Sequence, residues 1–230
     1  MRSLFFLILL SPCLSFAQTE SWTGASFDHE VTRRWGYAVD VEHRRSLVAA
    51  PEETFLMLLA GNISLIKNGS LTFGTRFEPP AHGDPGTLRV FTDLNYKVPL
   101  GESPFTLESR LRYQQDRPPG ENGNLRRVAL RPRLGVAAEL NGRLTLISEF
   151  EGRFRFDNRN EWSRVRYTAG LEFVATDRIK LDLFWRLEDR INQANPRSTT
   201  IFGLYAEYTL PNANDRDWKY RAPFGRKVTW

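Results

Sequence analysis

The sequence has almost no cysteine and no long hydrophobic run. Its single cysteine, Cys13, lies within the first 17 of 230 residues, so the remainder offers neither a disulfide nor thiol chemistry. After those residues the longest uninterrupted apolar run is 55–60. A membrane-spanning helix needs about 18 or more such residues. Any insertion into a membrane must therefore use strands.

Histidine is also scarce, which limits the catalytic chemistry available. Only His29, His43 and His82 occur, and their spacing matches no metal site. No glycine-rich phosphate-binding loop or nucleotide fingerprint is present. Ser46 lies near His43, but no third group is evident to orient the base. We expect no metal site and no cofactor, and an outer-membrane lipid-modifying hydrolase is the weakest functional alternative.

The first 17 residues have the features of a secretory signal peptide. Arg2 precedes an apolar core at 4–10, and the small residue Ala17 stands before the expected cleavage site. We therefore predict a signal peptide at 1–17 and one barrel domain at 18–230, exported to the outer membrane of a Gram-negative cell. Of the 32 basic residues only Arg2 lies in the signal, which leaves 31 basic against 27 acidic residues. This dispersed, mild excess gives no indication of nucleic-acid binding.

Apolar and charged residues alternate along most of the chain. In 106–113 the two sets are Leu107, Leu111 and Tyr113 on one face, and Glu108, Arg110 and Arg112 on the other. Because successive strand side chains point to opposite faces, each such segment has one apolar and one ionised side. A closed barrel in the outer membrane would turn the apolar side to lipid and enclose the charges.

Eleven segments show this pattern, and a twelfth is possible at 218–230. They span 22–31, 35–45, 54–67, 70–77, 87–98, 105–115, 127–140, 143–157, 162–175, 178–192 and 199–210. Asn68-Gly69 and Asn141-Gly142 are typical of tight hairpin turns. We expect an all-β, closed antiparallel transmembrane β-barrel of about twelve strands, with ten as the alternative. An even number would let the last strand pair antiparallel with the first.

The charged faces predict the lining of the barrel. Candidate lumen-lining residues are Glu108, Arg110, Arg112, Arg131, Arg133, Glu149, Glu151, Arg153, Arg155, Arg164, Arg166, Asp182, Arg186 and Glu188. The charged faces of the six segments from 105 to 210 carry thirteen basic and eight acidic residues. Arginine–carboxylate bridges are expected, because an unpaired buried charge costs several kcal/mol. A non-catalytic barrel filled by a salt-bridge network is the leading hypothesis, and a narrow, porin-like channel that prefers anions is the alternative.

The C-terminal residues are similar to a known assembly signal. Gly225, Val228 and Trp230 have the spacing of the terminal-strand motif by which outer-membrane proteins are recognised for assembly, although Pro223 interrupts it. The expected partners are therefore the barrel-assembly machinery and the lipid and lipopolysaccharide of the outer membrane.

The chain resembles the domain-of-unknown-function 2490 family of uncharacterised outer-membrane barrel proteins. The matching pieces are Trp22, the stretch WGYAVDVEHR that begins at Trp35, LESRLRYQQ at 107–115, the arginine-spaced 126–133, and 164–210 ending in GLYAEYTL. The resemblance implies a barrel fold and an outer-membrane location. It implies no reaction and no catalytic residues.

Overall fold

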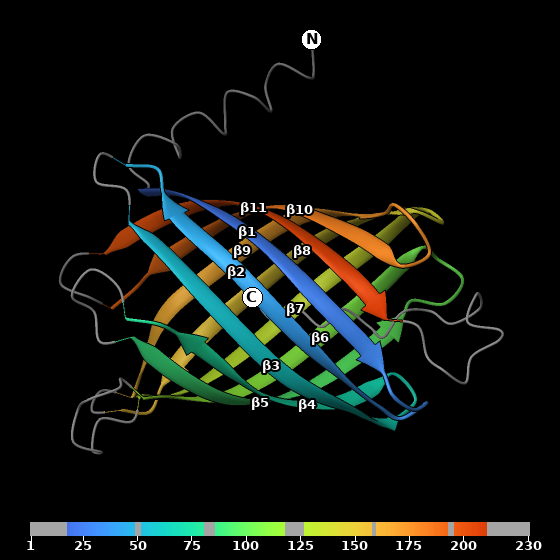
Figure 1. Ribbon diagram of the computed structural model, residues 1–230, viewed down its shortest axis with the longest axis horizontal. Coiled ribbons are helices and arrows are strands. Elements are labelled where there is room, and N and C mark those ends of the chain that lie inside the picture. Colours follow the sequence, from blue (N-terminus) through green and yellow to red (C-terminus); the bar gives the residue numbers. More distant parts are fainter. Residues whose placement is uncertain are drawn as a thin grey trace, which may run out of the picture.

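The structure is a computed structural model that describes residues 18–48, 52–80, 86–117, 127–157, 160–192 and 196–210. These residues form one closed β-barrel (Figure 1). None of the described ranges contains a helix long and apolar enough to cross a membrane. The predicted signal peptide at 1–17, the possible strand at 218–230 and the motif of Gly225, Val228 and Trp230 lie outside the described residues.

Eleven strands make up the barrel wall. They are β1 (Gln18–Glu30), β2 (Trp35–Ser46), β3 (Glu53–Ile66), β4 (Gly69–Glu78), β5 (Thr87–Pro99), β6 (Phe105–Arg117), β7 (Arg127–Asn141), β8 (Leu144–Arg155), β9 (Glu161–Val174), β10 (Ile179–Arg190) and β11 (Arg197–Leu210). Each has 10 to 15 residues, which suits the about 9–11 residues that a tilted strand needs to cross a bilayer.

The barrel closes through a parallel strand pair. All neighbouring strands pair antiparallel in chain order, except that β1 runs parallel to β11 from Gln18↔Thr199 to His29↔Leu210. The predicted all-β closed barrel is thus confirmed, with eleven described strands in place of about twelve. Along an odd number of alternating strands the first and last point the same way, so their pairing must be parallel. The antiparallel closure expected from an even count does not occur here.

The short connections lie together at one end of the barrel, which we call the turn end. They follow β1, β3, β5, β7 and β9, so β11 finishes at the turn end while β1 begins at the opposite end. Asn68 in the β3–β4 turn has a φ of 65°, as the Asn68-Gly69 sequence predicts. In the β7–β8 turn, the backbone N–H of Arg143 donates to the Asn141 side chain over 2.9 Å.

The two faces of the wall differ in the way that the alternation predicts. Every strand carries large apolar side chains that are exposed on the outside, for example Leu59 (56%), Leu134 (58%) and Leu183 (57%). The side chains between them are buried in the interior, and many are charged. The described barrel therefore has an apolar outer surface and an ionised core.

Candidate functional site

The barrel interior contains most of the charged side chains that the sequence singled out. Ten candidate lining residues are buried, namely Glu108, Arg110, Arg112, Arg131, Arg133, Glu149, Glu151, Arg166, Arg186 and Glu188. The remaining four, Arg153, Arg155, Arg164 and Asp182, are half-buried. Strand alternation on β6 to β10 brings them to one enclosed space.

Glu151 on β8 is the centre of the largest ion-pair network. Arg131 on β7 donates to its Oε1 atom from Nε over 3.1 Å, and Arg166 on β9 lies 3.3 Å from the same oxygen. Arg110 on β6 pairs with the other oxygen, Oε2. Arg166 also donates to Glu188 on β10 over 2.5 Å. The network thus joins five consecutive strands.

A second group of ion pairs connects β5, β6 and β8. Arg112 makes two hydrogen bonds of 2.7 Å to the two carboxylate oxygens of Asp93. Asp116 accepts from Arg89 over 2.6 and 3.0 Å and from Arg153 over 3.3 Å. Bidentate arginine–carboxylate geometry is the strong form of this contact. These pairs fix the register of the wall from the inside.

Three members of this group were not among the lining residues predicted from the sequence. Asp93 and Arg89 lie on β5, whose charges were not counted, although the same alternation runs through Thr87–Pro99. Asp116 lies one residue beyond the predicted end of the segment at 115, on the same face as Arg112. Extending the face assignment to every strand would have found all three.

Counting all eleven strands changes the charge balance. The buried acids are nine, Asp28, Asp40, Glu42, Asp93, Glu108, Asp116, Glu149, Glu151 and Glu188. The buried bases in the described residues are six, Arg110, Arg112, Arg131, Arg133, Arg166 and Arg186. The early strands contribute the buried acids Asp28, Asp40, Glu42 and Asp93. Further inward bases are half-buried and pair with interior carboxylates, namely Arg44, Arg76, Arg89, Arg153, Arg164 and Lys180.

An aromatic cluster fills the interior near the seam of β1 and β11. Trp22, Phe184, Ile201 and Tyr205 are buried together, and the rings of Phe184 and Tyr205 stack with centroids 5.3 Å apart. A Cβ atom at Gly203 would overlap the Phe184 ring, and one at Gly24 would overlap Tyr205. Glycine is thus required where these rings lie flat against the wall.

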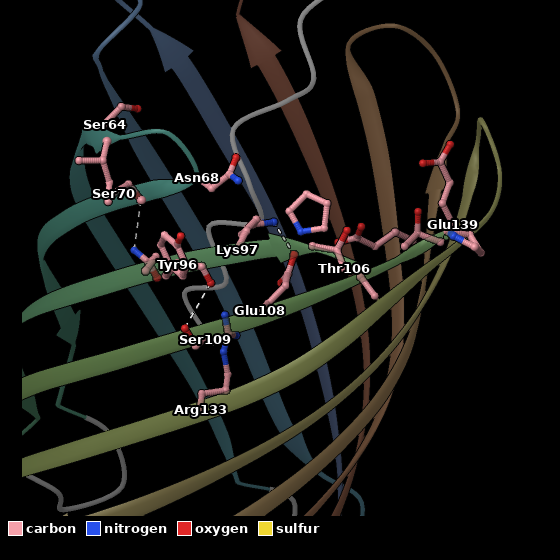
Figure 2. Close-up of a pocket in the computed structure, with 18 residues that line it drawn as sticks. Ser64, Asn68, Ser70, Tyr96, Lys97, Thr106, Glu108, Ser109, Arg133 and Glu139 are labelled. Atoms are coloured by element: carbon pink, nitrogen blue, oxygen red, sulfur yellow. Dashed lines mark hydrogen bonds and ion pairs between the residues drawn. The ribbon is translucent and has the colours of Figure 1, made fainter. Parts of the chain in front are cut away.

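A cavity of about 490 Å³ lies at the turn end of the barrel (Figure 2). Its lining includes the ion pair of Lys97 with Glu108, together with Arg133, which lies 3.2 Å from Glu149. Asn95 donates to Ser70 across 3.5 Å in the same cavity. Ion-paired side chains therefore line this cavity beside apolar ones such as Ile66 and Pro99.

His43, the candidate base of the hydrolase alternative, lies on the outer side of the barrel wall. His43 stacks on Phe55 with ring centroids 4.6 Å apart, and its Nε2 is 3.6 Å from Glu53. Ser46 is three residues further along β2 and so faces the other side of the strand. The Ser46–His43 pair is not assembled. Across the described ranges, no group of three or more metal-ligating side chains is placed to hold an ion.

A known family matches the chain over most of its length. The family described as "Protein of unknown function (DUF2490)" matches residues 19–200. This chain belongs to the DUF2490 family. The match begins in β1 and reaches into β11, so the DUF2490 region coincides with the barrel wall. No curated protein matches the chain.

Proposed function

We propose that this DUF2490 protein is a non-catalytic outer-membrane barrel whose interior is closed by an arginine–carboxylate network. The observation that carries the proposal is the distribution of side chains between the two faces. Each of the eleven strands exposes large apolar side chains outward, while the interior holds fifteen buried charges. Soluble monomers rarely expose apolar surface that continues around the molecule, whereas lipid-facing barrels require it.

The same distribution argues against a soluble ligand-binding barrel. In such a protein the apolar faces turn inward around a hydrophobic ligand. Here Leu134 and Leu183 point outward, and Arg112 and Glu151 point inward. The interior would not accept a hydrophobic ligand without removing paired charges from their partners.

The ion-pair network supports a filled interior over an open channel. Glu151 alone engages three arginines from three strands, and small barrels fill their interiors with side chains. The Ser46–His43 pair on which the alternative of a lipid-modifying hydrolase rested is not assembled. The barrel-assembly machinery and outer-membrane lipid remain the predicted partners.

Cell fractionation tests the location. The full chain should sediment with outer membranes and migrate faster on gels before boiling than after it, because closed barrels resist unfolding by detergent. Recovery as a soluble periplasmic monomer would overturn the proposal.

Single-cysteine labelling tests which surface meets lipid. Residues 18–230 contain no cysteine, so Leu183→Cys can carry an environment-sensitive fluorophore in reconstituted vesicles. Its emission should be blue-shifted and quenched by lipid-attached quenchers. Lys67→Cys, at an exposed position in the β3–β4 turn, is the matched control and should report water. Equal emission at the two positions would contradict a lipid-facing outer surface.

A further inference from the structure

Two buried arginines occupy similar surroundings but differ in their counterions. Arg112 lies over the Phe91 ring, 4.0 Å from its centroid, and binds both oxygens of Asp93. Arg186 lies 4.9 Å from the Phe184 ring and 5.4 Å from the Trp22 ring. Only 2–3% of either residue is exposed. In place of a carboxylate, Arg186 donates Nε to the Thr168 hydroxyl over 2.9 Å.

Arg186 is the exception among the six buried arginines of the described chain. Each of the other five has a carboxylate oxygen within 4.0 Å, in the pairs Arg110–Glu151, Arg112–Asp93, Arg131–Glu151, Arg133–Glu149 and Arg166–Glu151. No described carboxylate lies that close to Arg186, and its Nη1 atom has no hydrogen-bond partner.

The strand register explains why no carboxylate reaches Arg186. Its neighbours across the ladders are Thr168 on β9 and Ile201 on β11. Glu188, two residues further along β10, is already engaged by Arg164 at 2.9 Å and Arg166 at 2.5 Å. Thr168 is therefore the acceptor that contacts Arg186, while the carboxylates of Glu149 and Glu151 act on it only from farther across the interior.

A guanidinium in this position stays charged, because arginine does not lose its proton in proteins. A buried charge that no carboxylate of the described residues contacts is unfavourable. We infer that Arg186 is the centre of an anion site inside the barrel, which takes one small monovalent anion of the halide class. The anion would accept from the guanidinium Nη atoms while Thr168 holds Nε.

The surroundings restrict the size and charge of the anion. Trp22, Phe184 and Ile201 are buried beside Arg186 and offer apolar surface. An oxyanion with three or four oxygens would leave most of them without donors, which is costly in a buried site. Arg186 contributes a single guanidinium, which favours one negative charge, and the two carboxylates that contact Arg166 nearby are shared with Arg110, Arg131 and Arg164.

The test uses the folded full chain in uncharged detergent at constant ionic strength, with sodium gluconate replaced stepwise by sodium chloride. The apparent unfolding temperature, followed by heat-modifiable migration, should rise and saturate. A rise of about 2–4 °C is expected for modest ligand stabilisation in a chain of this size. Sodium phosphate at equal ionic strength should give no such rise. An equal rise with phosphate, or none with chloride, would overturn a halide site.

Arg186→Met should remove the chloride-dependent rise. Arg190→Met is the matched control, because Arg190 lies on the same strand but is exposed. It should keep the full rise. Retention of the rise in Arg186→Met would place any chloride site elsewhere.

Thr168→Asp keeps the test decisive if Arg186→Met fails to fold. This change puts a carboxylate at the position that already accepts from Arg186, as Asp93 does for Arg112. The variant should unfold at a higher temperature than the wild type in gluconate and should no longer respond to chloride. A full chloride response in Thr168→Asp would contradict the inference.

Discussion

The hydroxyl of Tyr205 on β11 donates to Glu42 on β2 over 2.9 Å. The two residues are 163 positions apart in the chain, and the bond passes over Gly24 of the intervening strand β1. It therefore ties together the three strands at the seam where β1 and β11 run parallel. The barrel is closed there by an interior polar contact as well as by the backbone ladder.

Tyr205→Phe should weaken the barrel at this seam. The change removes the donor to the buried Glu42 carboxylate and should lower the free energy of unfolding by about 1–3 kcal/mol. Urea titration in detergent, read as the loss of fast gel migration, measures the effect. Tyr208→Phe on the outer face, beside Phe27, should change it little. Equal losses in both variants would show that the hydroxyl bond does not stabilise the seam.

Gly203→Ala should be strongly destabilising because a Cβ there overlaps the Phe184 ring. A second change, Phe184→Ala, should relieve the overlap, so the double variant should recover stability relative to Gly203→Ala. Gly142→Ala is the control, since nothing lies within 4 Å of a Cβ at that position. The assay is the same urea titration. If Gly203→Ala is as stable as Gly142→Ala, the ring does not lie against the wall at Gly203.

Glu151→Gln should destabilise more than any other single neutralisation in the interior. It removes the negative charge that pairs with Arg110, Arg131 and Arg166. Breaking a buried ion pair costs about 3–5 kcal/mol. Glu139→Gln, at an exposed position of the turn-end cavity, should be close to neutral. Refolding yield and thermal midpoint from unfolded protein measure the difference. A mild effect at Glu151 would mean that water compensates the three arginines.

Leu183→Arg should impair insertion into vesicles. Leu183 is 57% exposed on the outer face, and an arginine facing lipid near the midplane costs about 2–4 kcal/mol. Leu183→Ala is the size control and should insert nearly as well as the wild type. Arg186→Ala, on the interior face, should impair insertion less than Leu183→Arg. The reverse order would exchange the inner and outer faces.

The sequence predicts those features that depend on local periodicity. The segment at 105–115 differs from β6 by two residues at one end, and Leu107 and Arg110 face outward and inward as expected, because strand alternation is a property of adjacent residues. The features that depend on strands far apart in the chain were not predictable in this way. The parallel β1–β11 seam follows from the total strand count.

Phe184 shows a second feature that the sequence pattern does not predict, namely which interior side chains contact one another. It shares its strand face with Asp182 and Arg186, so the alternation places it inside the barrel, but periodicity does not show which residues it contacts there. Its place is set by Gly203 on the neighbouring strand, which leaves room for the ring, and by Tyr205, on which it stacks. Which interior side chains touch depends on the register between strands, and that register is not encoded by periodicity alone.

Electrical recording from planar bilayers tests the central claim of a closed, ion-paired interior most directly. Purified wild-type protein should insert without steady conductance steps. Arg131→Gln, Arg153→Gln and Arg164→Gln should lower its thermal stability, because each removes a bridge in the network. Steady conductance in the wild type with anion selectivity that falls in these variants would contradict the filled interior and establish an anion channel. Cation selectivity would contradict both the filled barrel and the anion channel.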